Sequence, residues 1–302
     1  MLLAVALALD ALLGEPDWLW RRLPHPVVLM GRAVSALDAR WNRGRARRAK
    51  GVAAIVLLVA GAGMAAWAAQ VALGPVGTVV AAAVLLAQRS LVQHVAAVAA
   101  TLRAGGVAAG RNAVAMIVGR DTAAMDEPDI ARAAIESAAE NLSDGVVAPA
   151  FWFAVGGLPG IAIYKTVNTA DSTIGYLTPR HAAFGWAAAR LDDAMNWIPA
   201  RLTAVLILAA HGHRGMGAVA ADAARHRSPN AGWPEAALAR VLDVALAGPR
   251  SYDGVVRDYA FAHPAGRRSP GPADVDRAIA ALWRVWWAVL ALSLALGALS
   301  LR

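Results

Sequence analysis

An apolar run from Gly51 to Leu73, directly preceded by a dense basic segment, constrains the fold of this chain more than any other sequence feature. A helix needs about 20 apolar residues to cross the hydrocarbon core of a bilayer, and this run is long enough. The basic segment contains Arg40, Arg43, Arg45, Arg47, Arg48 and Lys50. Because loops rich in Lys and Arg stay on the cytoplasmic side, we expect the run to enter the membrane from the cytoplasm.

The composition extends this expectation to the whole chain. Of 302 residues, 58% are hydrophobic and only 17% are charged, which is too apolar for an ordinary soluble domain. We therefore expect an all-α, polytopic integral membrane protein forming a single membrane-embedded domain over residues 1–302. The bilayer is then its first partner, and the cytoplasmic membrane of a bacterium, crossed several times, is its expected location.

The net charge of +8 does not require a nucleic-acid partner. The basic residues flank apolar runs, no zinc-finger or RNA-binding motif is present, and the positive-inside rule accounts for them. We therefore expect no nucleic acid to bind. The chain has no cysteine, which excludes disulfides, thiolate metal sites and a cysteine nucleophile. Carboxylate, amide, His, Lys and Arg chemistry remains.

Apolar and basic segments alternate along the rest of the chain. A Gly74-Pro75 turn separates the first run from the next, and the last run carries tryptophans typical of a membrane interface. We expect spans near residues 51–73, 76–100 and 282–301, and cytoplasmic segments over residues 103–144 and 211–272. A further run over residues 146–167 is interrupted by Gly156-Gly157-Leu158-Pro159-Gly160. Non-helical backbone at membrane depth must be buried in protein or line a cavity, so this run predicts a re-entrant or broken helix pair.

Three clusters of acids and amides lie around this broken run. The first, Glu136, Glu140 and Asp144, repeats every four residues and would form a stripe on one helical face. The second places Asn168 three residues before Asp171. The third is Asp192, Asp193 and Asn196. Each cluster presents oxygen atoms on one side of a helix, and three such faces could converge on one cation.

A solvated helix surface with local ion pairs is the simpler interpretation of any one cluster. It fits the three clusters together less well, because like charges four residues apart repel and carboxylates near a membrane usually pair or bind ions. A Mg²⁺ ion held by a few carboxylates and by phosphate oxygens would explain acids gathered without equal numbers of bases. We expect Glu140, Asp144, Asp192 and Asp193 to bind this metal.

Motif searches exclude some common chemistries. No GxxxxGK[ST] phosphate loop occurs, so a bound nucleotide would need another cradle. The segment 215–220 matches GxGxxA without strands around it, and we interpret it as a chance match. No HExxH motif is present, which argues against zinc hydrolysis. His25 lies between two prolines that fix its backbone; it is either an interfacial loop residue or a phosphate contact.

Segments spread over nearly the whole chain resemble one family. They are Leu9-Asp10, Gly14-Glu15-Pro16, His25-Pro26, Val118-Gly119-Arg120-Asp121-Thr122, Arg132 with Glu136, Ala139-Glu140-Asn141, Asp144-Gly145, Ala148-Pro149, Asn168-Thr169, Asp171, Ala189-Arg190-Leu191-Asp192-Asp193, Asn196, Ile198-Pro199-Ala200-Arg201 and Ser228-Pro229-Asn230-Ala231-Gly232. In this order they resemble the CobD/CbiB family, the adenosylcobinamide-phosphate synthases of cobalamin biosynthesis.

The resemblance implies an ATP-dependent and Mg²⁺-dependent ligase, with its active site facing the cytoplasm. Such an enzyme joins a propionate carboxylate of adenosylcobyric acid to an aminoalcohol phosphate, and it could work beside other membrane enzymes of cobalamin assembly. An acyl phosphate intermediate would require metal and cationic clamps on phosphate. The residues that the resemblance implies as catalytic are Glu136, Glu140, Asp171 and Asp192. Those implied for substrate or phosphate binding are His25, Arg120, Asp121, Lys165, Asn168, Arg190, Asn196, Arg201 and Asn230.

Two other functions remain open from the sequence. A related branch of the family resembles AmpE-type proteins, which would make this chain a membrane sensor or regulator without catalysis. Prenyl-type transferases also hold Mg²⁺-diphosphate with Asp-rich and Asn-rich faces, but they place paired aspartate motifs on long spanning helices. Here the acids adjoin short or broken apolar runs, which favours the synthase. The basic residues Arg120, Lys165, Arg190 and Arg201 could equally be interfacial cations.

Overall fold

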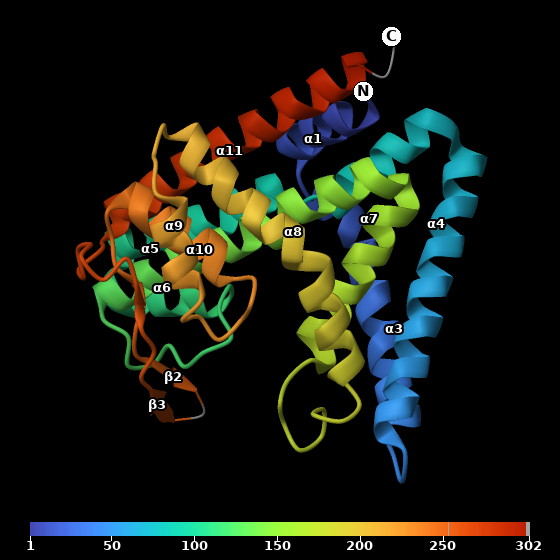
Figure 1. The fold of residues 1–302 in the computed structure, drawn as a ribbon, viewed down its shortest axis with the longest axis horizontal. Helices are drawn as coiled ribbons and strands as arrows, with labels where there is room; N and C mark the ends of the chain where they lie inside the picture. Colours follow the sequence, from blue (N-terminus) through green and yellow to red (C-terminus); the bar gives the residue numbers. More distant parts are fainter. Residues whose placement is uncertain (253, 300–302) are drawn as a thin grey trace. The chain divides into compact units, whose positions relative to one another are not determined.

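The fold was analysed in a computed structural model that describes residues 1–252 and 254–299 (Figure 1). The helices are α1 (Leu2–Leu13), α2 (Asp17–Trp20), α3 (Pro26–Trp41), α4 (Arg47–Leu85), α5 (Gln88–Ala115), α6 (Glu127–Leu142), the π-helical turn η1 (Ser143–Val147), α7 (Ala148–Ile174), α8 (Trp186–Ala210), α9 (Met216–Ala223), α10 (Gly232–Leu242) and α11 (Pro272–Leu299). The strands are β1 (Leu246–Ala247), β2 (Arg250–Tyr252), β3 (Val255–Arg257) and β4 (Phe261–Ala262). They pair antiparallel as β1 with β4 and β2 with β3. The expected all-α class is confirmed.

The chain divides into two compact units, neither of which is continuous in sequence. The expectation of a single membrane-embedded domain stays a prediction. Unit 1 contains Met1–Ala87, Ala148–Trp197 and the residues from Ser293 onward, and unit 2 contains Gln88–Val147 and Ile198–Leu292. Two clusters of candidate site residues, those of α7 and α8, therefore belong to unit 1. The acid stripe of α6 belongs to unit 2.

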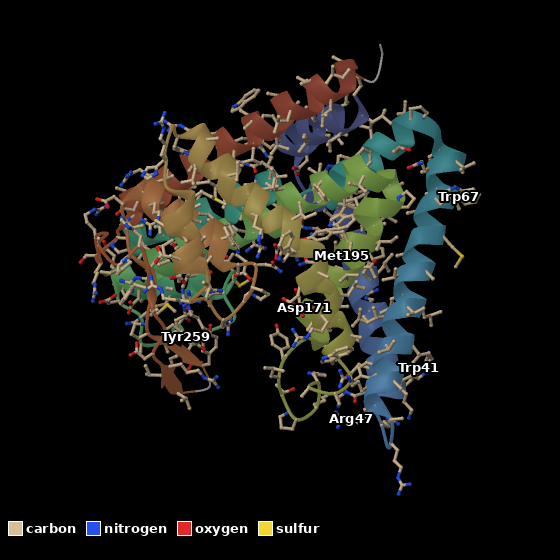
Figure 2. The ribbon with its side chains drawn as sticks, in the orientation of Figure 1. Trp41, Arg47, Trp67, Asp171, Met195 and Tyr259 are labelled. Atoms are coloured by element: carbon tan, nitrogen blue, oxygen red, sulfur yellow. The ribbon has the colours of Figure 1, made fainter. Side chains whose placement is uncertain are left out.

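Three helical stretches of the described residues are long and apolar enough to cross a membrane: Arg47–Ala115, Glu127–Ile174 and Pro272–Leu299. Helix α4 also exposes large apolar side chains, including Val56, Met64 and Val71. Trp67 is 62% exposed and points away from the neighbouring helices (Figure 2). An apolar surface of this kind is rare on soluble monomers and is expected where a helix faces lipid.

The expected spans differ from the helices in their bounds. Gly74 has φ 62° and breaks α4, as the Gly74-Pro75 turn predicts, but the helix then continues to Leu85. The expected span over residues 76–100 is therefore divided between the end of α4 and the start of α5. The last helix begins at Pro272, ahead of the expected start at residue 282, and residues 300 and 301 lie outside the described part of the chain.

Helix α7 consists of two arms joined at a break, as the Gly156–Gly160 sequence predicts. Gly156 and Gly157 have non-helical backbone angles, and Gly157 has φ 60° in the left-handed region. The arms fold back closely, because a Cβ atom on Gly160 would lie 2.2 Å from the carbonyl oxygen of Trp152. The broken helix pair is thus confirmed, while its entry and exit on one side of a membrane stay a prediction.

The second arm of α7 begins with a hydrogen bond from its backbone to a side chain of α4. The side-chain Oε1 of Gln70 accepts the backbone N–H of Leu158 at 2.9 Å. A helix N-terminus leaves such N–H groups without partners inside the helix, so Gln70 satisfies one of them. A side chain on Gly157 would collide with this oxygen, since its Cβ would lie 2.7 Å away.

Buried side chains fix α7 against its neighbours in unit 1. One core cluster joins α3, α4, α7 and the start of α8 through Val34, Ile55, Ala170, Ile174 and Phe184, with further alanines between them. A second cluster contains Ala148, Tyr164, Val167 and Met195. Because it includes residues from both arms of α7 and from α8, the second cluster sets the position of the polar residues that follow.

Candidate active site

Two of the expected polar clusters meet in unit 1, between α7 and α8. Asn168 donates from Nδ2 to Oδ1 of Asp192 at 3.4 Å, and Asn196 donates from Nδ2 to Oδ2 of the same carboxylate at 3.0 Å. The hydroxyl of Tyr164 donates to Oδ1 of Asn196 at 2.9 Å. Asp171, one turn beyond Asn168 on α7, adds a second carboxylate (Figure 2). The second and third sequence clusters thus form one site, named here the α7–α8 acid site: Asn168, Asp171, Asp192 and Asn196.

The protonation of Asp192 reflects this setting. Burial and, after it, the negative charge of Asp171 raise the pKa of Asp192 to about 7, against the opposing hydrogen bonds from Asn196 and Asn168. A cation between the two carboxylates would relieve both unfavourable effects. The α7–α8 acid site is therefore chemically prepared to bind positive charge.

The donor set of this site fits Mg²⁺ bound together with phosphate. Mg²⁺ is usually held by one or two carboxylates, waters and substrate phosphates, and not by a cage made only of protein. Within residues 1–252 and 254–299, no group of three or more His, Asp or Glu side chains is arranged to hold a metal alone. Asp171 and Asp192 supply two carboxylates, and the asparagines orient one of them.

Asp193 and Arg190, which the sequence proposes for metal and phosphate, lie next to each other at the start of α8. Arg190 Nη1 is 3.7 Å from Asp193 Oδ2, and the Arg190 side chain is mostly exposed. Burial raises the pKa of Asp193, and the charge of Arg190 opposes this. The two residues are three positions apart on one helix, which is the spacing of an ordinary solvent-exposed ion pair.

His25 caps helix α3. Its Nδ1 accepts the backbone N–H of Val27 at 3.2 Å, and Pro26 follows as the first helical residue. The ring stands edge-on to Trp20 with centroids 4.5 Å apart. Burial lowers the pKa of His25, against the charge of Glu15, so the imidazole is neutral at pH 7. Lys165, on the α7 face that carries Asn168, lies within electrostatic reach.

Unit 2 contains a buried network centred on Glu136. Oε2 of Glu136 accepts from Arg120 Nη2 at 2.6 Å and lies 3.2 Å from Arg250 Nη2. Oε1 accepts the backbone N–H of Ala247 at 2.6 Å. Since both oxygens are occupied, we infer that Glu136 positions the two arginines and is not itself free to take part in chemistry.

The other members of the acid stripe differ from Glu136. Glu140 is exposed, and Arg120, Arg227 and Arg250 all lie within electrostatic reach of its carboxylate. Asp144 lies in the π-helical turn η1, because α6 ends at Leu142. The wider turn means that a four-residue spacing no longer guarantees a common face, so the stripe is regular only from Glu136 to Glu140.

Asp121, expected to bind substrate, connects two loops. Its N–H donates to the carbonyl of Ser251 at 3.1 Å, and its Oδ2 accepts from the Ser251 hydroxyl at 2.7 Å and from the N–H of Gly254 at 2.8 Å. These contacts fix the Arg120 loop to the β2–β3 hairpin. They also hold Arg250, the first residue of β2, beside Arg120.

Arg201 and Asn230, both expected to contact substrate, are also brought together in unit 2. Arg201 Nη1 donates to Asn230 Oδ1 at 3.4 Å, and its guanidinium stacks over the Trp233 ring at 4.5 Å from the centroid. Asn230 is held in turn by its backbone N–H, which donates to the Ser228 hydroxyl at 3.2 Å. The Ser228-Pro229-Asn230 segment therefore orients Arg201.

Sequence reasoning missed four residues that surround the Glu136 network: His226, Arg227, Glu235 and Arg250. Glu235 is 1% exposed and Arg250 lies 3.4 Å from it. A single acid among the alanines and leucines of α10 was the available signal, because such a residue must pair or lose its charge when it is buried.

Comparisons with known proteins decide the family. A family model described as "CobD/Cbib protein" matches residues 3–282. The chain belongs to the CobD/CbiB family. A "Cobalamin biosynthesis protein CobD" of Rhizobium meliloti (strain 1021) is 52% identical over 297 residues, covering 92% of this chain and 91% of that protein. Proteins of the same name from Sinorhizobium sp and Brucella suis biovar 1 are 50% and 46% identical, each covering 94% of this chain and 93% and 92% of the relative. No solved structure matches this CobD/CbiB chain significantly.

Proposed function

We propose that this CobD/CbiB protein is an enzyme of cobalamin biosynthesis that joins a propionate carboxylate of adenosylcobyric acid to an aminoalcohol phosphate, using ATP and Mg²⁺. Condensing a carboxylate with an amine in water is uphill, and phosphorylation of the carboxylate by ATP would make the step favourable. Phosphoryl transfer needs positioning and charge stabilisation more than covalent help from the protein. The observation that carries the proposal is the pairing of Asp171 and Asp192 in the α7–α8 acid site.

The α7–α8 acid site would hold Mg²⁺ through Asp171 and Asp192. When bound, Mg²⁺ neutralises negative charge on the phosphate groups of ATP. Asn168 and Asn196 donate to the two oxygens of Asp192 and so keep its carboxylate in one orientation. That orientation is fixed before the ligand arrives, which is the condition for strong electrostatic stabilisation.

The arginines of unit 2 would bind phosphate oxygens. Arg120 and Arg250 are held in place by Glu136, and an arginine guanidinium matches the geometry of a phosphate group. Arg227 is exposed and adds a third positive charge near Glu140. Glu140, with free access to solvent, would contact either a metal ion or a positively charged part of a substrate.

A sensor without catalysis is the alternative that this geometry favours least. The relatives are named for cobalamin biosynthesis. A regulator would also have no need for a carboxylate such as Asp192, whose ionised form is disfavoured by burial and by Asp171. Groups with pKa values perturbed in this way gather at catalytic and binding sites.

The test is amide formation from adenosylcobyric acid and aminopropanol phosphate, followed over a Mg²⁺ titration in purified protein. Asp192→Asn should lower turnover by orders of magnitude and change the Mg²⁺ dependence. The matched control is Asp258→Asn, on an exposed residue of unit 2, which should behave like the wild type. Wild-type turnover and Mg²⁺ dependence in Asp192→Asn would exclude the α7–α8 acid site as the metal site.

We also propose that the protein crosses the bacterial cytoplasmic membrane more than once and that its chemistry faces the cytoplasm. The three long apolar stretches and the lipid-like exposure of α4 support several crossings. ATP and the basic segments before α4 both favour the cytoplasmic side.

A further inference from the structure

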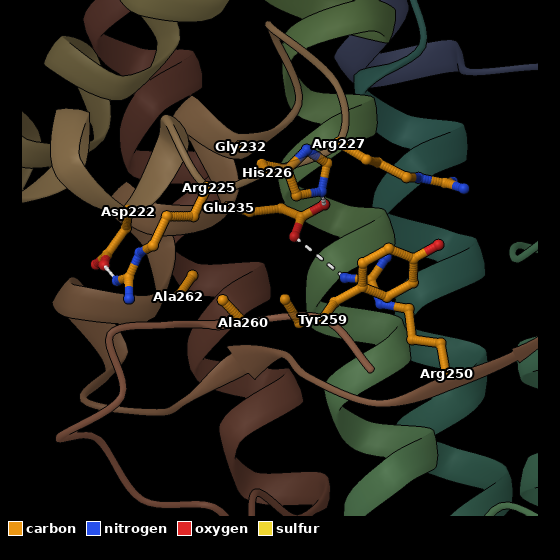
Figure 3. Close-up of a pocket in the computed structure, with 11 residues that line it drawn as sticks. Asp222, Arg225, His226, Arg227, Gly232, Glu235, Arg250, Tyr259, Ala260 and Ala262 are labelled. Atoms are coloured by element: carbon orange, nitrogen blue, oxygen red, sulfur yellow. Dashed lines mark hydrogen bonds and ion pairs between the residues drawn. The ribbon is translucent and has the colours of Figure 1, made fainter. Parts of the chain in front are cut away.

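A pocket in unit 2 lies beside the Glu136 network and contains His226 and Glu235, to which the proposed reaction has so far given no role. It is bordered by α9, by the turn after it, by α10 and by the segment from Tyr259 to Ala262 (Figure 3). The cavity volume is about 20 Å³, enough for about one water. The cavity therefore admits a water-sized group such as an ammonium and not a corrin ring, and the rest of a ligand would lie outside it.

A carboxylate with incomplete hydrogen bonding lies at the centre of this pocket. Glu235 Oε2 is 3.4 Å from Arg250 Nη2, and Oε1 is 3.6 Å from His226 Nε2 (Figure 3). Both distances exceed those of strong charge-assisted hydrogen bonds, which are about 2.7–2.9 Å. Arg250 also lies nearer to Glu136, at 3.2 Å. Glu235 can therefore accept a further donor.

His226 lies between Glu235 and the backbone of Ser228. Its Nδ1 is 3.1 Å from the backbone nitrogen of Ser228 and 3.3 Å from the carbonyl oxygen of the same residue, and its Nε2 faces Glu235 at 3.6 Å. Burial lowers the pKa of His226 to about 4, which keeps the ring neutral at pH 7.

Glu235 has the protonation behaviour of a general base. Burial and, after it, the charges of Glu136 and Glu140 raise the pKa of Glu235 to about 8, against the opposing charges of Arg250 and Arg120. A carboxylate with a pKa near the working pH is well matched to taking a proton from an ammonium group.

Positive charge lies at another part of the same pocket. Arg227 is exposed, and in Figure 3 its guanidinium points away from Glu235. It stacks over Tyr252 at 5.2 Å, and no carboxylate of the described residues forms an ion pair with it. The pocket thus offers an acceptor at one place and a cation at another, as a small zwitterion with an ammonium and a phosphate would require.

We propose that this pocket binds the aminoalcohol phosphate, with its ammonium group at Glu235 and its phosphate at Arg227. This inference rests on the proposed ligase function and assigns that reaction's smaller substrate to named residues. Glu235 takes one proton from the ammonium group and becomes a neutral carboxylic acid. The free amine then uses its lone pair to form the C–N bond with the activated carboxylate, as the C–O bond to phosphate breaks. Phosphate leaves with the electron pair and accepts the second proton, which the nitrogen loses as the amide forms.

The first test measures recognition of the phosphate group in the full-length, membrane-reconstituted protein. Arg227→Gln should raise KM for aminopropanol phosphate by about tenfold or more, the usual size of a lost charged hydrogen bond, and leave KM for adenosylcobyric acid unchanged. It should also reduce the preference of the enzyme for aminopropanol phosphate over aminopropanol. Arg257→Gln, on an exposed strand residue outside the pocket, is the matched control and should keep wild-type values.

The second test measures the base. Glu235→Gln preserves shape and should lower kcat/KM about a hundredfold at pH 7, the lower end of the usual contribution of a general base. Its rate should recover as the pH approaches the pKa of the substrate ammonium, because free amine then forms without the enzyme. A merely structural role would not produce this recovery.

The outcomes separate the two proposals. If the wild-type enzyme is active and Arg227→Gln keeps the wild-type KM values and phosphate preference, the pocket assignment is wrong. The ligase function is unaffected by that result. An active Glu235→Gln enzyme with the wild-type pH profile would exclude Glu235 as the base. Wild-type protein that binds aminopropanol phosphate in calorimetry but forms no amide contradicts the ligase function alone, whereas absence of both contradicts both.

Discussion

Asn196 holds Asp192 from one turn away on the same helix, with Nδ2 donating to Oδ2 of the carboxylate at 3.0 Å. The other end of the Asn196 amide accepts from the Tyr164 hydroxyl, so the amide cannot rotate without losing a buried hydrogen bond. Tyr164 of α7 therefore fixes the orientation of Asp192 through Asn196 of α8. The orientation of this buried carboxylate thus depends on the packing of α7 against α8 as well as on the spacing of residues along α8.

The pKa of Asp192 leads to a first prediction on stability. Its value of about 7 lies above the ordinary 3.8, so the folded state binds the proton more tightly than the unfolded state does. The associated stability is complete below pH 3.8 and is lost as the pH rises through 7. Without Mg²⁺, the melting temperature should therefore fall between pH 6 and pH 8, and Asp192→Asn should reduce this fall.

Mg²⁺ should reverse the effect, because it binds the ionised carboxylate. The rise in melting temperature on adding Mg²⁺ should be larger at pH 8 than at pH 6, and it should disappear in Asp192→Asn. Thermal unfolding in detergent at both pH values measures both quantities. An equal Mg²⁺ effect in the variant would place the metal elsewhere.

A second prediction compares two glutamates of helix α6 with the same substitution. Glu136→Gln leaves Arg120 buried without its counter-ion and Arg250 with Glu235 alone, and it should destabilise the protein by about 3–5 kcal/mol. Glu140→Gln removes an exposed carboxylate and should change stability by no more than about 0.5 kcal/mol, while amide formation falls by orders of magnitude. Chemical unfolding and turnover measured on both variants give the answer. Normal turnover in Glu140→Gln would mean that Glu140 is a solvated surface residue without a role in the reaction.

A third prediction concerns the close approach of the two arms of α7. Gly160→Ala places a methyl group against the carbonyl of Trp152 and should cost about 1–3 kcal/mol of stability, as overpacking does. Gly61→Ala, in a helical position of α4 with no atom within 4 Å of the added carbon, should be neutral or stabilise by up to about 1 kcal/mol. Unfolding midpoints of the two variants measure the difference. Equal midpoints would mean that the arms can separate without loss.

A fourth prediction concerns the side of the membrane. Single cysteines at Ala123 and Arg214, introduced into this cysteine-free chain, lie in exposed parts of the two segments expected in the cytoplasm. A membrane-impermeant maleimide should label neither in intact spheroplasts and both after permeabilisation. Labelling of either before permeabilisation would assign that segment to the outside.

Local features of this fold were predictable because they depend on residues close in sequence. The break at Gly156 and Gly157 and the start of α6 after Asp126 follow from backbone preferences and capping, whereas the start of α3 at Pro26 was not predicted. The contact between Asn168 and Asp192 was expected in outline, because the sequence spacing places the polar residues of each cluster on one side of a helix.

Other features depend on partners far along the chain. Arg250 reaches Glu136 from a short strand, and periodicity carries no information on such a contact. The interruption between Leu85 and Gln88 was also missed, because Leu86 and Ala87 have no residue type that breaks a helix. The convergence of all three polar clusters on one cation stays a prediction, as do the metal-binding roles of Asp144 and Asp193.

The hydrogen bond from Leu158 to Gln70 has a consequence for how unit 1 comes apart. The second arm of α7 cannot complete its first turn until α4 is in place, and Gln70 lies one turn before the bend of α4 at Gly74. A segment whose first hydrogen bond is made to another element is expected to fold and unfold together with that element. Hydrogen exchange should therefore find Leu158 and the α4 turn around Gln70 opening together, as one cooperative piece of the protein.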